Sequence, residues 1–216
     1  MIIFTLKIAG GNPTALVYKS NSRKKIVKEL LKKVEQIGFV SKIKKIPELK
    51  MMGGELCINA TLAFASTLKN EGKLYTSGLN GLIEYKNKDN KTTIKFPLKY
   101  KKNKNIILFE GIGFIFVRKK KITKRLLSIY CSRYKLPAFG AIIYKGNKII
   151  PYIYVKRADS FVKETACGSG SIAYGIFIGE RKIIQPTGKA IYVKLGKLIE
   201  VSANISKENL IKFKRI

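Results

Sequence analysis

The sequence predicts an α+β protein of two similar domains, each a mostly antiparallel sheet rolled around a central helix. The first observation is an order of elements that occurs twice: strands, an amphipathic helix, strands, a cysteine-bearing loop, an apolar helix and further strands. The second is that both apolar helices, over about 58–70 and 168–178, are hydrophobic on most sides, as enclosed helices are. The third is a charged, polar stretch at 99–105. We interpret it as a linker and place the domains at 1–100 and 101–216.

Apolar runs bounded by Gly, Pro and Asn predict the strands, and helical spacing of apolar residues predicts the amphipathic helices. In the first half the expected elements are strands at 2–9, 14–18, 39–43, 73–77, 81–86 and 91–97, a turn at 10–13 and a helix at 23–37. In the second half they are strands at 106–110, 113–117, 138–144, 149–156, 182–184, 190–195 and 197–202, and a helix at 121–133. A last strand at 210–216 could return to the first domain.

The charge is extreme: 44 basic against 13 acidic residues give a net charge of +31 over 216 residues. Such a charge can mark a nucleic-acid surface. Here the basic residues are scattered along the whole chain, without a basic stripe interleaved with aromatic residues. We interpret the charge as compositional bias on solvated faces, and expect no specific nucleic-acid partner beyond non-specific attraction. A non-catalytic basic nucleic-acid-binding protein on the same fold stays the alternative from another class.

The cysteines and the apolar runs indicate the cellular compartment in which the protein is expected. The apolar start is too short for a signal peptide, and no run approaches the ~20 residues of a membrane span. Three cysteines, Cys57, Cys131 and Cys167, form no disulfide or zinc spacing, and the chain has no histidine. We therefore expect a cytoplasmic protein with reduced thiols, no metal site and no membrane partner.

Two of the cysteines stand in small-residue segments before the apolar helices. Cys167 lies in Glu-Thr-Ala-Cys-Gly-Ser-Gly at 164–170, and Cys57 follows Gly-Gly-Glu-Leu at 53–56. Backbone N–H groups at a helix N-terminus bind anions, and the helix dipole favours a thiolate there. A twofold relation between the halves would aim both sulfurs at one cleft, a favoured place for small ligands. Cys131 has no such loop and is expected to be a small buried hydrophobe.

Two opposed thiols suit inversion at a carbon atom. A thiolate removes a proton from the carbon, and a thiol on the other side delivers a proton to the opposite face. Convergent N–H groups would stabilise the charge that develops beside a carboxylate, and the scheme needs no cofactor. Glu55 and Glu164, each close to a cysteine, either orient the substrate's amino group or satisfy N–H groups of their own loops; both options stay open.

Cys-Ile-Asn-Ala at 57–60 and the segment at 164–170 resemble the two active-site segments of diaminopimelate epimerase, and Gly-Asn-Pro at 11–13 resembles that family's early Gly-Asn segment. The family comprises cofactor-independent amino-acid racemases and epimerases with two catalytic cysteines. The resemblance implies an acid/base pair of Cys57 and Cys167, no cofactor and an amino acid as small-molecule substrate. The substrate-binding residues that it implies are Asn12, Ile58, Asn59, Ala60, Glu164, Thr165, Gly168, Ser169 and Gly170.

The sequence differs from diaminopimelate epimerase at positions expected to hold the distal amino-acid group of diaminopimelate. Ile58 stands where the epimerase has Gly, and Lys-Arg-Ala-Asp at 156–159 stands where it has Glu-Arg. Residues that would touch the α-carbon are kept, and those that would hold the distal end of diaminopimelate are not. The chain is more similar to histidine racemases, which share Glu-Thr-Ala-Cys-Gly-Ser-Gly and Gly-Gly-Glu-x-Cys. We expect histidine or another amino acid as substrate, with diaminopimelate as the alternative.

Two further families are weaker alternatives. Phenazine-type isomerases share the rolled fold and an early Gly-Asn-Pro, but they use carboxylates instead of a cysteine pair. Proline racemases use two cysteines, but their first motif normally carries a histidine, which this chain lacks. The side-chain pocket and the oligomeric state stay open, with a homodimer among the options.

Overall fold

The computed structural model describes residues 2–18, 23–118 and 121–208, and within them it contains four helices. The helices are α1 Arg23–Leu30, α2 Ile58–Ala65, α3 Lys124–Tyr134 and α4 Gly168–Ile178. The strands of the first half are β1 Ile2–Ile8, β2 Gly11–Tyr18, β3 Gln36–Ile43, β4 Ile46–Met51, β5 Glu71–Thr76, β6 Ile83–Lys88 and β7 Lys91–Phe96. Those that follow are β8 Lys101–Asn103, β9 Ile106–Leu108, β10 Gly113–Val117, β11 Ala138–Lys145, β12 Lys148–Val155, β13 Ser160–Lys163, β14 Lys182–Ile184, β15 Ala190–Lys194 and β16 Ile199–Glu208.

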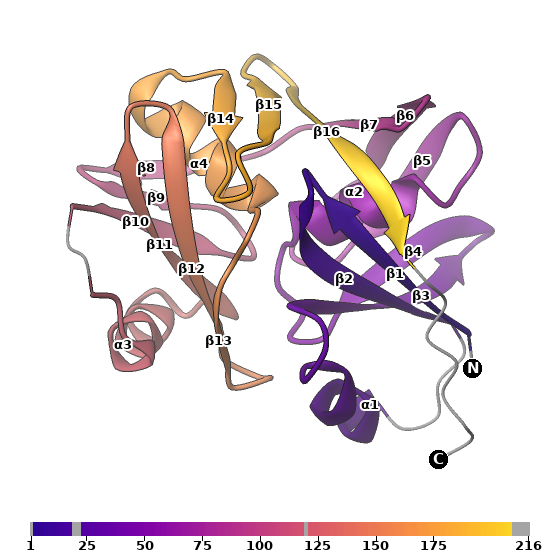
Figure 1. Cartoon of the computed structure of the whole chain (residues 1–216), viewed down its shortest axis with the longest axis horizontal. Coiled ribbons are helices and arrows are strands. Elements are labelled where there is room, and N and C mark those ends of the chain that lie inside the picture. The colour runs from indigo at the N-terminus through magenta and orange to yellow at the C-terminus, as the bar shows by residue number, and fades with distance from the viewer. Residues whose placement is uncertain (1, 19–22, 119–120, 209–216) are drawn as a thin grey trace.

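The chain forms two halves that lie side by side, each with a sheet around one helix, α2 in the first half and α4 in the second (Figure 1). Hydrogen bonding runs in order from β1 to β7 and continues through β16, β15, β14, β12, β11, β10 and β9 to β8, while β13 pairs with β12. β16 pairs with both β7 and β1, so its far end closes the first half into a barrel. The predicted fold class is confirmed.

The two halves follow one plan of strand pairing. In the first, β2 lies parallel to β3 across α1, β3 antiparallel to β4, and β4 parallel to β5 across α2. In the second, β10 lies parallel to β11 across α3, β11 antiparallel to β12, and β12 parallel to β14 across α4. The antiparallel sets β5-β6-β7 and β14-β15-β16 complete the match. Each cysteine loop therefore occupies the same place in its half.

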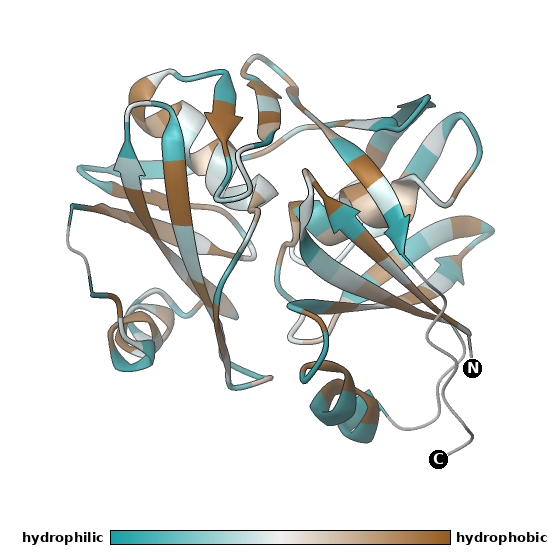
Figure 2. Cartoon of the chain, in the orientation of Figure 1, coloured by the Kyte–Doolittle hydropathy of each residue, from teal (hydrophilic) through white to brown (hydrophobic). Residues whose placement is uncertain are grey.

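Burial separates the two kinds of helix. Every residue of α2 and the first eight residues of α4 are buried, as expected for apolar helices inside a rolled sheet. Helices α1 and α3 lie outside and bury one face each, through Ile26 and Leu30 in α1 and Leu127 and Cys131 in α3. Polar residues colour the outer surfaces of these two helices, while apolar residues recur along the strands (Figure 2). The amphipathic helices thus cover the sheets, and the apolar ones fill them.

The predicted element bounds were wrong in several places; the strand expected at 197–202, for example, is β16 and runs from Ile199 to Glu208. The helix expected at 23–37 ends at Leu30, and Ile37 belongs to β3, where it pairs with Ala15 of β2. The helix expected at 58–70 ends at Ala65, because the next hydroxyls, Ser66 and Thr67, bond to carbonyls of the last turn. The turn expected at 10–13 is mostly strand, since β2 already begins at Gly11.

Two strands were missed, and one stretch expected to be a linker contains a strand. β4 carries a proline and two charged residues, and β13 is only four residues long, so neither shows a clear apolar pattern. The stretch at 99–105 contains β8. The domain boundary near residue 100 stays a prediction, and the strand expected at 210–216 lies outside the described residues.

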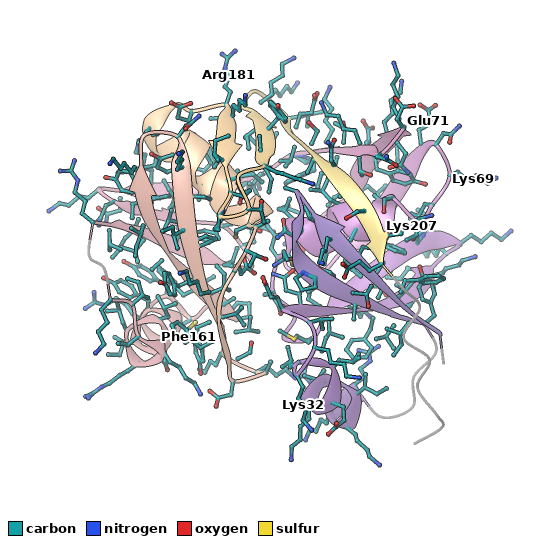
Figure 3. All side chains as sticks on the ribbon, viewed as in Figure 1. Lys32, Lys69, Glu71, Phe161, Arg181 and Lys207 are labelled. Atoms are coloured by element: carbon teal, nitrogen blue, oxygen red, sulfur yellow. The ribbon has the colours of Figure 1, made fainter. Side chains whose placement is uncertain are left out.

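The positive charge lies on the outside of the molecule. Lys32, Lys69 and Arg181 point away from the body at its edges (Figure 3). Within the described residues, no helix has the length and apolar character needed to cross a membrane.

Candidate active site

The two cysteines cap the two enclosed helices in the same way. Cys57 has extended backbone angles, and its Sγ accepts the Ala60 N–H at 3.2 Å; Cys167 has extended angles, and its Sγ accepts the Gly170 N–H at 3.3 Å. One residue further on, a hydroxyl donates back to the cysteine carbonyl at 2.7 Å in both halves. Each sulfur therefore sits at the positive end of a helix, as the small residues around it predicted.

Asn59 links the start of α2 to the peptide groups around Cys167. Its Nδ2 donates to the Ala166 carbonyl at 2.7 Å, and its Oδ1 accepts the Gly168 N–H at 2.8 Å. The side chain is almost completely buried. Since these bonds bracket Cys167, Asn59 fixes the position of the opposite cysteine.

Ser169 makes the reciprocal contacts from the start of α4. Its Oγ accepts the Ile58 N–H at 3.2 Å and donates to the Leu56 carbonyl at 3.4 Å, so it brackets Cys57. Each cysteine is thus held by the residue two positions after the other. The N–H groups of residues 58 and 168, which the sequence assigned to the substrate carboxylate, are engaged in these bonds in the structure.

The two helix starts approach closely because one of them carries no side chain. A Cβ on Gly168 would lie 2.6 Å from Cγ2 and 2.9 Å from Cβ of Ile58, inside any normal contact. Ile58 is completely buried. The departure from Gly at position 58 is therefore accommodated by the glycine at position 168.

Both cysteines line one cavity between the halves. No Lys or Arg lies in its wall, as far as the chain is described. Its polar wall is formed by Glu35, Gln36, Glu55, Asn59, Ser160, Glu164, Gly168 and Ser169, and its apolar wall by Met52, Leu56, Ile112, Ile153, Val155 and Val162.

A buried network joins Cys57 to Glu164, which lies three residues before Cys167. The Cys57 thiol donates to Gln36 Oε1 at 2.6 Å, and Gln36 Nε2 donates to Glu164 Oε1. Glu164 is 2% exposed, and its Oε2 has no partner with hydrogen-bond geometry among the described residues, although the Cys167 and Asn12 side chains lie close enough to lower its pKa. A buried carboxylate oxygen without a partner is costly and points to a missing donor at this place in the cavity.

The site disfavours negative charge on its thiols and on its carboxyl groups. Burial, and then the nearby Glu164 carboxylate, raise the pKa of Cys57 and of Cys167 well above the ordinary thiol value. Burial raises the pKa of Glu164 to about 8, and the Glu35 carboxylate adds to this effect. Burial also raises the pKa of Glu55 to about 7, although the Gly53 N–H opposes it. An arriving cation would reverse these shifts.

Glu35 ties the two halves together at the edge of the site. Its Oε2 accepts Asn12 Nδ2 at 3.0 Å and the Thr165 N–H at 3.2 Å, and its Oε1 accepts the Thr165 hydroxyl at 2.7 Å. The Thr165 hydroxyl also accepts the Asn12 N–H at 2.6 Å. Asn12 adopts φ +47°, a left-handed conformation that asparagine tolerates.

The structure sorts the sequence-predicted residues into two groups. Cys57, Asn59, Glu164, Cys167, Gly168 and Ser169 line the cavity. The others, which stand behind this wall or in the Glu35 clamp, are Asn12, Ile58, Ala60, Thr165 and Gly170. The structural data do not test their contacts with a substrate, so those stay predictions.

Sequence reasoning missed Glu35 and Gln36 because it placed both in the helix expected at 23–37. The signal that could have found them is a polar pair directly before the buried run of β3. Cys131 packs in a separate apolar cluster on α3, as expected. Within the part of the chain that is described, no group of His, Cys, Asp and Glu side chains is arranged to hold a metal ion.

Curated proteins with similar sequences are amino-acid racemases. Histidine racemases from two strains of Fusobacterium nucleatum subsp. nucleatum are 31% and 32% identical to the chain over 229 aligned residues. The alignments cover 85% of this chain, and 85% and 86% of the relatives. No family model matches the sequence.

Solved structures share the fold at low identity. A predicted epimerase from Pseudomonas aeruginosa gives a TM-score of 0.71 at 9% identity, covering 100% of this chain and 99% of that chain. A probable proline racemase from Agrobacterium radiobacter K84 gives 0.65 at 8% identity, covering 99% and 93%. A phenazine biosynthesis protein from Enterococcus faecalis gives 0.57 at 15% identity, covering 97% and 98%.

The fold and these relatives define an isomerase that acts on amino acids. The chain belongs to the diaminopimelate epimerase-like family of amino-acid racemases, within which it is homologous to the histidine racemases.

Proposed function

We propose that the protein racemises histidine, without pyridoxal phosphate or another cofactor, by a two-base reaction between Cys57 and Cys167. One observation carries the proposal. The two sulfurs, 110 positions apart in the chain, cap helices α2 and α4 identically and line one cavity. Histidine is the candidate substrate because the relatives named above are histidine racemases. We infer that the reaction takes place in the cytoplasm, because the two-base scheme requires reduced thiols and the cytoplasm keeps thiols reduced.

The reaction inverts the α-carbon in two proton transfers. One cysteine, as thiolate, takes the α-hydrogen as a proton, and the electron pair of the C–H bond moves into the substrate carboxylate. The other cysteine, as thiol, gives its proton to the opposite face of the carbon. The product leaves with the two cysteines in exchanged protonation states, so the reverse reaction uses the same groups. The positive ends of α2 and α4 stabilise the charge that develops on the carboxylate.

Glu164 is the group that receives the substrate's α-ammonium. Its Oε2 lacks a hydrogen-bond donor, and the carboxyl lies beside the cysteines whose pKa it raises. An ammonium at this oxygen would neutralise the carboxylate and bring a positive charge close to both sulfurs. Both effects lower the thiol pKa. Substrate binding would therefore generate the thiolate that the empty site disfavours.

The test is exchange of the α-hydrogen with solvent deuterium. Purified protein in D₂O is incubated with L-histidine, D-histidine, diaminopimelate and a panel of other L-amino acids, and proton NMR follows the α-signal while chiral chromatography follows inversion. We expect histidine to exchange and invert. The Cys57→Ser and Cys167→Ser variants should each lose inversion.

Cys131→Ser is the matched control, because Cys131 is a buried cysteine outside the cavity. It should keep the activity of the unchanged protein. Absence of α-exchange with every amino acid in the panel would refute the proposed function. Full racemisation by either active-site variant would remove that cysteine from the mechanism.

A further inference from the structure

The cavity contains a buried carboxyl group that the proton transfers do not use. Glu55 lies two residues before Cys57, is 4% exposed and lines the cavity. Its Oε2 accepts the Gly53 N–H at 2.8 Å. No Lys or Arg forms an ion pair with it in the described part of the chain, although the protein carries 44 such residues. The fold therefore keeps a carboxyl group in the site without its own counter-charge.

The cavity that Glu55 lines also has aliphatic side chains in its wall. Met52, Ile153, Val155 and Val162 contribute to the same cavity wall. Gly53 allows the carboxyl to lie against β12, because a Cβ at that position would lie 2.3 Å from Val155 Cγ1 and 2.7 Å from Glu55 Oε2. A cavity lined by this carboxyl and by aliphatic side chains suits a substrate group that is both apolar in body and basic at one atom.

The charge of the cavity is unbalanced even with an amino acid bound. Three carboxyl groups, Glu35, Glu55 and Glu164, line the wall. The α-ammonium of a substrate offers one positive charge, and the Glu164 Oε2 that lacks a donor is its natural partner. Glu35 already accepts three hydrogen bonds from Asn12 and Thr165. In the described part of the chain, Glu55 accepts only backbone N–H groups of its own loop, from Gly53 and from itself, and is the carboxyl left for a second basic group.

We propose that Glu55 binds a basic nitrogen of the substrate's side chain and so makes the enzyme selective for amino acids with basic side chains. The inference rests on the proposed function, since it assumes that the Cys57–Cys167 cavity is the substrate site. An imidazole is the best match among such groups, because its flat apolar faces would contact the aliphatic wall while one nitrogen meets the carboxyl.

Proton sharing strengthens the match to imidazole. The pKa of Glu55 lies at about 7 in the empty site, and that of a free imidazole at about 6.5. At neutral pH the pair therefore holds one proton, which either partner can carry, and the hydrogen bond is kept in both cases. A neutral aliphatic side chain would leave the Glu55 carboxyl without a partner. The enzyme would therefore bind substrates with such side chains less tightly than substrates with basic ones.

Glu55→Gln is the variant that tests this role. The amide oxygen of Gln can still accept the Gly53 N–H, so the loop keeps its hydrogen bond and the main change is the lost charge and proton. We expect the KM for histidine to rise about 10- to 100-fold, the usual consequence of losing a hydrogen bond to a charged group. The rate of exchange with leucine or glutamine should stay within about twofold. Glu71→Gln, at an exposed position on β5 (Figure 3), is the control and should change neither.

Binding measured by calorimetry separates this inference from the proposed function. The unchanged protein should bind L-histidine and L-ornithine more tightly than L-leucine and L-glutamine, and Glu55→Gln should lose that preference. If Glu55→Gln lowers the affinity for all four amino acids equally, Glu55 has a purely structural role and the inference is overturned. The inference is also overturned if the unchanged protein shows no preference for basic side chains. Absence of α-exchange in a protein that still binds histidine through Glu55 would instead refute the racemase reaction alone.

Discussion

The two cysteine-bearing ends have the same backbone and different neighbours. Both sulfurs cap an enclosed helix and accept the N–H three residues further on, at 3.2 and 3.3 Å. Cys57 donates to Gln36, whereas the Cys167 N–H is held by Gln185 Oε1 at 2.8 Å. The carboxyl groups also differ: Glu55 accepts the Gly53 N–H of its own loop, and Glu164 belongs to a polar network that includes Gln36. The repeated backbone thus supplies a symmetric pair of sulfurs, and the side chains around it break the symmetry.

This division suits a racemase. The two faces of the α-carbon must be treated alike, since the reaction runs in both directions, and a duplicated helix start provides that equivalence. The amino, carboxyl and side-chain groups of the substrate must each have a distinct place, and unequal neighbours provide it. The halves also differ in closure: β16 completes the barrel around α2, while α4 ends in Ile178, which is 44% exposed.

The largest expected effect tests the symmetry of the sulfurs. In Cys57→Ser and in Cys167→Ser, racemisation should fall roughly 10²–10⁴-fold, the usual contribution of a positioned acid or base. Each variant should still exchange the α-hydrogen of the single enantiomer that its remaining cysteine faces. Deuterium uptake measured separately with L- and D-histidine should show opposite preferences for the two variants. If both variants exchange the same enantiomer, the sulfurs do not face opposite sides of the carbon.

The next effect compares the two carboxyl groups through the pH dependence of stability. Glu55 has a pKa of about 7 in the folded protein and an ordinary value of 4.5, so the folded state binds the proton more tightly. The free energy of unfolding should therefore fall as pH rises from about 4.5 to about 7, by at most about 3 kcal/mol from this group. Glu164, with a pKa of about 8, should extend the fall to about pH 8.

Denaturant unfolding at pH 5, 6, 7 and 8 would measure this fall. Glu55→Gln should flatten the curve up to about pH 7, and Glu164→Gln should flatten it up to about pH 8, so both variants gain stability at pH 8 relative to the unchanged protein. Glu71→Gln, whose carboxyl is exposed, should follow the unchanged protein. An unchanged pH dependence in both active-site variants would show that these carboxyl groups are not buried as described.

The smallest effect concerns the unequal residues at the helix starts. Gly168→Ala should destabilise the protein by about 1–3 kcal/mol, because the new methyl group overlaps Ile58. Ile58→Gly removes the overlapping atoms, so the double variant should be less destabilised than the sum of the two single changes. Gly196→Ala, where the nearest atom would lie at 3.5 Å, is the control for a glycine without this contact. Strictly additive effects would contradict the close packing of the two helix starts.

The sequence was most informative where a pattern is local. The apolar helix at 168–178 was predicted with the bounds that α4 has, because its residues are apolar all round and Gly179 ends it in a left-handed conformation. The helix expected at 23–37 was too long, because Val34 and Ile37 continue the helical spacing although Val34 lies in the connection after α1 and Ile37 lies in β3. The spacing of apolar residues alone cannot show where the helix ends and the strand begins. The parallel pairing of β3 with β2 determines that boundary.

The candidate site divides in the same way. Cys57 and Cys167 could be found from the sequence, because a cysteine among small residues before an apolar helix has a local physical meaning. Glu35 and Gln36 show in the sequence only as a polar pair before β3, because their role depends on contacts with Thr165 and Glu164, more than 120 positions away. The reciprocal bonds of Asn59 and Ser169 were equally invisible, since each requires the other half in place.

The sequence by itself determined two rolled sheets around two apolar helices, a cysteine at the start of each helix, and a resemblance to cofactor-independent racemases. These features follow from residue periodicity and short motifs, which act over a few residues. Only the tertiary structure decided that both sulfurs share one cavity, that its wall holds three carboxyl groups and no cation in the described residues, and that β16 joins the halves. The reason is that charge balance and strand closure depend on contacts between residues far apart in the chain.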